Sequence, residues 1–484
     1  MSGLHGVETI ELTSGTVAVE TISTAVIGLV GTAPAAATAT SSGGVVGSAL
    51  LDNVLTFRAK TPGRTGNQLK VEAVPAVPDA QNPVAVPTSA SYSGTTLSVV
   101  LGCDDKGVVT ATAAGVADAV NAVTKSQIEA EATTSTGLVA AFSLVLSGGE
   151  DEPFPLNTPV SVTGAAMTAR LGTAGTLPQA MADISNQTSG LVVVVRVEES
   201  TKPDQMRAAL LAGMNAWSAA EYHPRILIAT GFSEDDAIGK GLETMANKLR
   251  AVAYVDCASM ATPKEVLLRQ QNYGARVELL RPRVLITTLS GENICRPYSA
   301  CAAGLRARID ADKGWWWSKS NQEVYSILGL EQVDEFVASD ANCQANLLNM
   351  ANVSTIVRRD GFRHWGNRLC SPDPQWRFES VRRSADVIED SIQNTVIQYV
   401  DRPLDKQNTD DIIGTINAYM RQLVSLGAIF GGCAWLDEEL NTAETLAAGW
   451  VFIDYDFGPK SPTERITMRT KINKDYAVGA LAEV

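Results

Sequence analysis

The residue types that carry acid–base, nucleophilic or metal chemistry are scarce in this chain and widely spaced. The 484 residues include three histidines, His5, His223 and His364, and none has the spacing to another histidine or cysteine that a zinc site needs. A catalytic triad is a spatial arrangement and could use a distant serine, but no G-x-S-x-G elbow supports one. We therefore expect no enzyme, no cofactor and no metal, and keep an α/β hydrolase with a β-rich accessory domain as a remote alternative.

One loop has the outline of a phosphate-binding site. A strand-like run at 225–230 is followed by a loop between Gly231 and Gly241 and then by a helical pattern. The glycine spacing is too long for a phosphate loop, Gly241 replaces the metal-binding hydroxyl, and three consecutive acidic residues would repel phosphate. Ser233 with Asp236 is better interpreted as a helix N-cap.

The densest group of reactive side chains is RRDGFRHWGNRLC, residues 358–370. It could belong to an active site, a nucleic-acid reader or an assembly element. The net charge of −14 and the lack of a second basic patch argue against nucleic acid. Arginines can stack on Phe362 and Trp365 and pair with Asp360, which suits assembly. We interpret the stretch as a hinge between two domains, expect Trp365 to be buried, and name as hinge residues Arg358, Arg359, Asp360, Phe362, Trp365 and Arg368.

The composition predicts several folded domains. Hydrophobic residues make up 45% and charged residues 19% of a length above the size limit of one core. The N-terminus lacks the basic and apolar regions of a secretory signal, and no apolar run reaches a membrane-spanning length, so we expect synthesis and folding in a cytoplasm and no membrane insertion. The seven cysteines are scattered, and we expect them to be reduced and mostly buried.

The elements that must position these residues change in type along the chain. Polar–apolar alternation at 7–12 and a β-branched run at 21–30 predict two early strands. An Ala/Thr/Ser/Gly-rich stretch then predicts an inserted β-rich domain. Its expected elements are strands at 54–60, 67–74, 95–101 and 139–146 and one helix at 114–123.

A series of alternating strands and helices follows. The apolar run 191–197 is typical of a parallel strand covered on both faces. Helical patterns with Met206 and Ile238 alternate with strands at 225–230 and 251–255, and a helix at 262–273 and a strand at 284–287 continue the series. This order predicts a mainly parallel α/β sheet.

The last hundred residues predict a third kind of structure. A helix is expected at 410–426, capped by Asn408 or Thr409 and ended by Gly427, and a strand at 449–457. After a Gly/Pro-rich break, apolar and polar residues alternate again. Half-buried strands are therefore expected near both termini, where their partners can lie on another chain.

Several motifs in this order resemble the tail sheath proteins of contractile-tailed phages and R-type bacteriocins, above all those of P2-like phages. The matching stretches cover the chain except for about residues 41–151. They are HGV at 5–7, FPLNTPV at 154–160, KLRA at 248–251, ANLLN at 345–349, RRDGFRHWGNR at 358–368 and FIDYD at 452–456.

The resemblance implies a multidomain α/β and α+β fold. An α/β domain with a mainly parallel sheet is expected at 152–357, and an α+β inner domain is expected to combine 358–464 with the first strand. Residues 1–40 would hold the N-terminal arm and that strand, 41–151 the inserted β-rich outer domain, and 465–484 the C-terminal arm.

The resemblance also implies a structural subunit that polymerises as a helical sleeve around a tail tube and contracts to drive the tube through the host envelope. Expected partners are further copies of the chain, the tube protein, the baseplate and the tail terminator, all within a virion tail. A sheath of a bacteriocin or of a secretion-like apparatus stays open as an alternative. The inserted domain is expected to decorate the sleeve, with receptor or glycan binding as the other option.

Two sets of site residues are implied. The exchanged strands would use the alternating residues of both arms, namely Val7, Thr9, Ile10, Leu12, Ile466, Met468, Thr470 and Ile472. The candidate tube contact lies on the expected C-terminal helix, at Asp410, Asp411 and Arg421.

Overall fold

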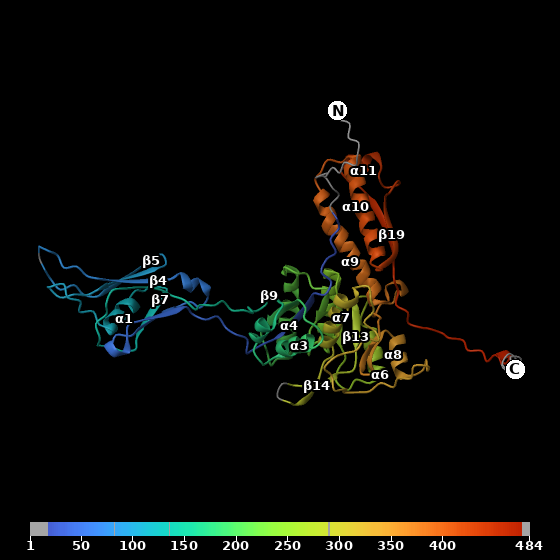
Figure 1. The fold of residues 1–484 in the computed structure, drawn as a ribbon, viewed down its shortest axis with the longest axis horizontal. Helices are drawn as coiled ribbons and strands as arrows, with labels where there is room; N and C mark the ends of the chain where they lie inside the picture. The colour runs from blue at the N-terminus through green and yellow to red at the C-terminus, as the bar shows by residue number, and fades with distance from the viewer. Residues whose placement is uncertain (1–17, 82, 135, 289–290, 477–484) are drawn as a thin grey trace, which may run out of the picture. The chain divides into compact units, whose positions relative to one another are not determined.

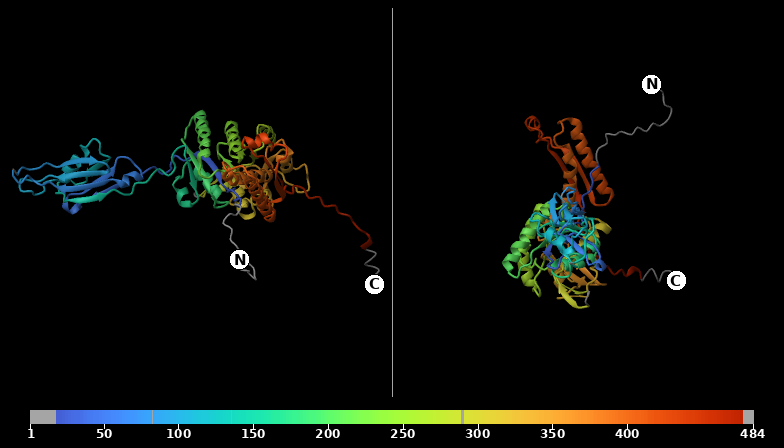
Figure 2. Two further views of the ribbon diagram at one scale, coloured as in Figure 1. Left: turned by 90° about the horizontal axis from the view of Figure 1, so that it is seen from above. Right: turned by 90° about the vertical axis from the view of Figure 1, so that its left-hand side faces the viewer.

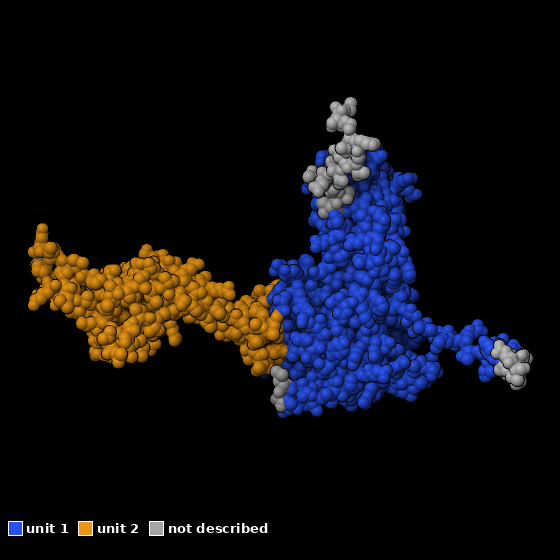
Figure 3. All heavy atoms as spheres, in the orientation of Figure 1, with its two compact units in different colours: residues 1–32, 161–163, 179–484 blue, residues 33–160, 164–178 orange. Residues whose placement is uncertain are grey.

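The computed structural model describes residues 18–81, 83–134, 136–288 and 291–476, and the chain forms two compact units. Unit 1 contains Met1–Thr32, Ser161–Thr163 and Gln179–Val484, and unit 2 contains Ala33–Val160 and Gly164–Pro178 (Figures 1 and 3). The expected β-rich insertion lies within unit 2.

Unit 1 is built on an eight-stranded sheet. Its strand order is β18-β17-β13-β12-β11-β1-β10-β9, and the pairs from β10 to β17 are parallel. The strands are β1 (Ile27–Thr32), β9 (Pro159–Val162), β10 (Val192–Val197), β11 (Ile226–Ile228), β12 (Val252–Asp256), β13 (Val277–Leu280), β17 (Val353–Arg358) and β18 (Phe362–Trp365).

Helices cover this sheet as the apolar patterns predicted. α4 (Pro203–Asn215) and α5 (Asp236–Leu249) place Met206, Leu210 and Ile238 in one core with the strand valines. A Cβ at Gly213 of α4 would lie 2.5 Å from Val197, so the glycine allows the close approach of helix and strand. The other helices of this part are α3 (Thr176–Ser185), α6 (Pro263–Gln270), α7 (Ser299–Lys313) and α8 (Gln344–Met350).

Two predicted strands lie in a different sheet from the one expected. The early run forms β1 between β10 and β11 of the parallel sheet, and not part of the C-terminal inner domain. It is buried along its full length, as a central strand with two covered faces requires. The strand β14 (Val284–Thr287) belongs to a separate antiparallel sheet with β15 (Asn293–Arg296) and β16 (Gly329–Leu330), and β13 takes the expected place in the parallel series.

The C-terminal part of unit 1 packs two long helices on a two-stranded sheet. α9 (Glu379–Val396) and α10 (Lys406–Ser425) share a core with β19 (Ile429–Leu436) and β20 (Ile453–Pro459). The right-hand view of Figure 2 shows the two orange helices side by side. Val19 joins the same core, so the stretch before β1 contributes here although β1 does not. A short helix, α11 (Ala443–Ala447), lies between the two strands in the chain.

The predicted C-terminal helix exists, but it begins earlier than expected. α10 starts at Lys406, and the side chain of Asp405, rather than that of Asn408 or Thr409, caps it by accepting a hydrogen bond from the Asn408 backbone. The chain reverses at Gly427, which has a φ of 77°, as the stop signal predicted.

Unit 2 confirms the predicted β-rich character. A three-stranded sheet (β2-β3-β7) and a four-stranded sheet (β5-β6-β4-β8) share one core with a helix. Thr40 and Glu150, which flank most of these elements in the chain, exchange two backbone hydrogen bonds of 2.9 and 3.2 Å. The elements are β2 (Gly43–Val46), β3 (Leu55–Ala59), β4 (Lys70–Pro75), β5 (Ser89–Ser93), β6 (Thr96–Leu101), α1 (Ala113–Asn121), β7 (Ile128–Ala132) and β8 (Phe142–Val145).

Within the described residues, no helix is long and apolar enough to cross a membrane, and no group of three or more histidine, cysteine or acidic side chains could hold a metal ion.

Candidate functional site

The β19–β20 pair is a sheet with two free edges. Leu436 pairs with Ile453, Ala434 with Tyr455 and Gly432 with Phe457, and no other described strand joins either side. Tyr455 and Ala434 pack towards α9 and α10. Two-stranded sheets are marginal alone, and free edges are templates for a further strand.

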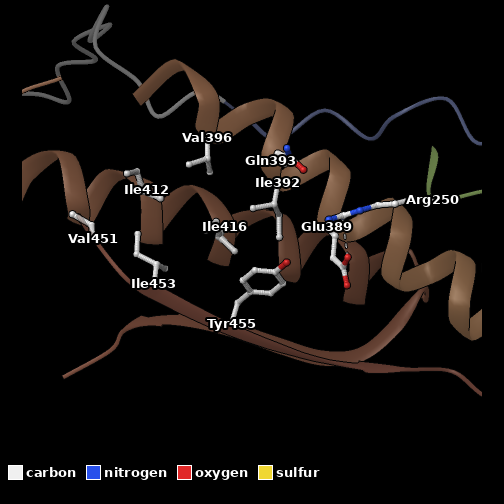
Figure 4. A pocket seen from close by; sticks show the side chains of 10 residues that line it. All are labelled: Arg250, Glu389, Ile392, Gln393, Val396, Ile412, Ile416, Val451, Ile453 and Tyr455. Atoms are coloured by element: carbon white, nitrogen blue, oxygen red, sulfur yellow. Dashed lines mark hydrogen bonds and ion pairs between the residues drawn. The ribbon is translucent and has the colours of Figure 1, made fainter. Parts of the chain in front are cut away.

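A groove opens between β20 and the two helices. Figure 4 shows apolar side chains from α9, α10 and the β20 segment pointing into a cavity of about 330 Å³. An ion pair between Arg250 and Glu389, with 2.9 Å between nitrogen and oxygen, lies at one end. The apolar lining residues are Ile392, Val396, Ile412, Ile416, Val451, Ile453 and Tyr455. This core is incompletely filled on the side of β20.

The C-terminal arm leaves the body as an exposed, extended chain. From residue 461 to 473 the described chain forms no helix or strand. Ile466, Met468 and Ile472 are 78–87% exposed, although their alternation predicted a half-buried strand. Large apolar side chains are rarely so exposed in a row without a partner surface. The predicted N-terminal arm residues Val7, Thr9, Ile10 and Leu12 lie outside the described residues.

The predicted hinge is a β-hairpin of the parallel sheet. β17 and β18 pair from Thr355–Trp365 to Arg358–Phe362, and Asp360 and Gly361 turn with φ of 48° and 97°. Residues 355–365 are therefore part of the sheet itself, and a hinge role for the stretch stays a prediction.

Trp365 is half-buried, and not buried as expected, with its ring edge-on to Phe336 at 4.7 Å. The arginines of this motif contact different partners. Arg358 lies over the ring of Phe362 at 5.9 Å, Arg359 is at the turn, and Arg368 pairs with Glu464 rather than with Asp360.

His364 of the motif belongs to a buried charged cluster. Its Nδ1 lies 2.9 Å from the Tyr298 hydroxyl and its Nε2 3.1 Å from Glu278. Lys319 also pairs with Glu278, and it donates to Glu379 at 2.7 Å. All of these side chains are nearly inaccessible to solvent.

The charges in this cluster set each other's protonation. Burial raises the pKa of Glu278, but the positive charge of Lys319 and the hydrogen bond from His364 outweigh burial and lower it to about 2. Burial lowers the pKa of His364 despite the Glu278 carboxylate. At neutral pH the cluster therefore holds a charged Glu278 beside a neutral His364.

α9 is the element that joins the sheet to the C-terminal core. Near its start Arg383 donates to Asp310 of α7 at 2.7 Å, and one turn later Asp386 forms a bidentate pair with Arg276. Ile388 and Ile392 of the same helix are buried in the C-terminal core. The passage between the two parts is thus one continuous helix.

Sequence reasoning missed this helix and its partners. Its charged residues recur every three or four positions, which marks one helical face and could have revealed it. Those residues are Glu379, Arg382, Arg383, Asp386, Glu389 and Asp390.

The loop with the outline of a phosphate-binding site, residues 231–241, is hydrogen-bonded to the protein's own carboxylates. Asp256, at the end of β12, accepts hydrogen bonds from the Ser299 backbone at 2.8 Å and from the Ser233 hydroxyl at 3.0 Å. Asp256 thereby links Ser233 of this loop to the first residue of α7. Asp235 caps α5, so the predicted cap by Ser233 with Asp236 was wrong. His223 is exposed in the loop before β11.

The predicted tube-contact residues lie on α10. Asp410 and Arg421 are exposed, and Asp411 is half-exposed and accepts a hydrogen bond from Gln407 at 2.8 Å. Of three consecutive tryptophans at 315–317, Trp315 is buried and Trp317 is 49% exposed.

Two family models match the chain over adjacent ranges. Residues 198–369 match the phage tail sheath protein central domain, and residues 371–473 match the phage tail sheath C-terminal domain. The tail sheath protein of Escherichia phage P2 is 33% identical over 73% of this chain and 94% of its own length. The tail sheath protein of Burkholderia phage BcepMu is 31% identical over 98% of this chain and 97% of its own length.

Solved structures have the same fold at lower identity. The sheath complex of an extracellular contractile injection system (PVC) in its contracted state has a TM-score of 0.54 and 16% identity, covering 67% of this chain and 89% of that one. The contracted helical sheath of the anti-feeding prophage has a TM-score of 0.53 and 17% identity, covering 66% and 89%.

Proposed function

The chain belongs to the phage tail sheath family and is a contractile sheath subunit, and we propose that subunits join by exchanging terminal β-strands. The observation that carries this proposal is the combination of an exposed arm with apolar residues at every second position and a two-stranded sheet with free edges. Strand addition gains affinity from backbone hydrogen bonds and register from alternating side chains.

The β19–β20 sheet is the proposed acceptor. An arm added beside β20 would present every second side chain towards α9 and α10, on the face where Ile453 and Tyr455 already point. Ile466, Met468 and Ile472 have this spacing. Burying them in the groove would remove large apolar areas from water, and each side chain contributes roughly 1.5–3 kcal/mol when fully buried. Thr470 keeps the same register.

The N-terminal arm is the second proposed donor, through Val7, Thr9, Ile10 and Leu12. With one strand from each terminus, every subunit is tied to two neighbours. Subunits can then rotate as rigid bodies during contraction without separating.

The proposed partners follow from the sleeve. They are further copies of this chain, the tail tube protein, the baseplate and the tail terminator, in a virion tail assembled in the host cytoplasm. Asp410, Asp411 and Arg421 of α10 are the proposed tube contact, because they present charge on the helix face turned away from the core. We propose no catalytic role.

The β-rich insertion is proposed to decorate the sleeve. Its flanking residues Thr40 and Glu150 are hydrogen-bonded to each other, so its strands and helix can be carried without breaking the parallel sheet of unit 1. Receptor or glycan binding by this region stays a second candidate. Strand exchange of this kind would equally suit the sheath of a bacteriocin or of a secretion-like apparatus. The neighbouring genes would distinguish these alternatives from a phage tail.

Deletion of residues 465–484 tests the proposal. Electron microscopy of the full-length protein at high concentration should show helical tubes, and the truncated protein should stay a folded monomer with an unchanged thermal midpoint. Tube formation by the truncated protein at the normal concentration would refute strand exchange by the C-terminal arm.

A further inference from the structure

A single ion pair holds the base of the C-terminal arm. Arg368 donates to both oxygens of Glu464, from Nε at 2.8 Å and from Nη2 at 2.6 Å, and its Nη1 donates to the Asn349 carbonyl at 3.2 Å. The side chains of Arg368 and Glu464 are 11% and 30% exposed. Although Glu464 is an exposed residue, a bidentate pair with a half-buried arginine is more directional than a surface ion pair with one contact.

The two partners come from distant parts of the chain. Arg368 follows the β18 hairpin and is tied by a backbone bridge to Phe378, just before α9. Glu464 lies five residues after the end of β20 and immediately before the arm. Glu464 is itself an exposed residue, as is every described residue from 465 to 476, but its carboxylate is held by Arg368. Glu464 therefore marks the point at which the arm leaves its own subunit.

The short segment between β20 and Glu464 has a second restraint. Lys460 lies 5.5 Å from the centre of the Phe430 ring, a cation–π distance. Pro459 and Pro462 restrict the backbone on both sides. These contacts restrain the path of the backbone from the C-terminal sheet to Arg368.

We propose that Arg368 is a positioning residue that fixes where the C-terminal arm departs, and thereby which neighbouring subunit the arm reaches. This inference rests on the proposed strand exchange. With the pair formed, the arm is free only from Arg465 onwards. Without it, residues 461–464 also become free, and a flexible segment of this length has an end-to-end distance of roughly 11 Å. A longer tether lowers the effective concentration of the arm at its acceptor.

Glu464→Gln is the main test, because it keeps the shape of the side chain and removes the charge. The lowest concentration at which sheath tubes form, measured by sedimentation and electron microscopy, should rise on the order of tenfold. The thermal midpoint of the dilute monomer should not change. Asp204→Asn, which removes an exposed partner of Arg207, is the matched control and should leave the threshold unchanged.

Limited trypsin digestion shows directly whether the Arg368–Glu464 pair holds the base of the arm. In Glu464→Gln, cleavage after Lys460 should become faster, while cleavage after Arg469 within the exposed arm should keep its rate. Arg368→Lys, which keeps the charge but loses the paired donors, should fall between wild type and Arg368→Gln. The double exchange Arg368→Glu with Glu464→Arg should recover most of the lost assembly.

The proposed role of Arg368 would be overturned if Glu464→Gln changed neither the lowest concentration for tube formation nor the rate of cleavage after Lys460. This holds even if deletion of 465–484 abolishes tubes. If that deletion leaves tubes intact, strand exchange itself fails, and Lys460 cleavage still reports whether Arg368 holds the arm.

Discussion

Arg276 and Asp386 form a buried bidentate ion pair between the start of β13 and the middle of α9, with nitrogen–oxygen distances of 2.6 and 2.8 Å. Both side chains are 5% exposed. Arg225 and Arg250, which precede β11 and β12, pair with the next turn of α9. The sheet therefore holds α9 through arginines that lie at the N-terminal ends of three neighbouring strands.

Removing one member of this pair should destabilise the protein strongly. Asp386→Ala leaves the Arg276 charge buried without its carboxylate, which costs about 3–5 kcal/mol in comparable sites. Urea unfolding followed by circular dichroism measures the change. Asp204→Ala removes an exposed carboxylate and should cost less than about 0.5 kcal/mol. Equal losses in both variants would contradict the importance of the Arg276 pair.

Acid should weaken unit 1 through Glu278. Its folded pKa of about 2 is lower than the value of about 4.3 in unfolded chains. The charged carboxylate therefore stabilises the fold above about pH 4.3, and this contribution is lost as the pH falls towards 2. Glu278→Gln should be less stable at pH 7 and lose less stability between pH 4.5 and 3. A parallel pH dependence of urea midpoints in the two proteins would argue against this assignment.

The alternation of the arm predicts which positions tolerate charge. Met468→Asp places a carboxylate on the face proposed to enter the groove and should prevent tube formation at concentrations well above the normal threshold. Thr467→Asp, one residue earlier, points to the opposite face and should assemble almost normally. Both are measured by sedimentation of polymer. If the two variants assemble alike, the arm does not bind as a strand in this register.

The insertion should be removable. Because Thr40 and Glu150 are already hydrogen-bonded, a short Gly-Ser linker replacing residues 41–149 closes the chain with little strain. The variant should fold with the thermal midpoint of unit 1 unchanged and still form tubes under the electron microscope. Loss of tubes with retained folding would show that the insertion takes part in assembly and is more than decoration.

Local patterns predicted the elements well. The run of valines that became β10 and the helical pattern around Ile238 in α5 are properties of short windows, and both were confirmed. The strand β1 was also found, but a window of six apolar residues does not say which sheet accepts it. Its place between β10 and β11 depends on crossover connections made by the rest of the chain.

The motif at 358–370 shows the other limit. Its composition indicated arginine–aromatic contacts, and its glycines indicated a turn, as observed at Gly361. The partner of Arg368 is 96 residues away, and the cluster around His364 draws on Glu278 and Lys319 from separate elements. Such pairs are set by tertiary packing, so no spacing rule in one sequence could identify them.

The continuity of α9 has a mechanical consequence. A helix of 18 residues is about 27 Å long and has no loop at which it can bend freely. Ion pairs join its first half to the sheet, and its second half is part of the core that packs against β19 and β20. If a neighbouring subunit turns the C-terminal sheet, α9 turns with it and transmits the rotation to the α/β sheet. No flexible linker lies between the two parts along this helix to absorb the motion.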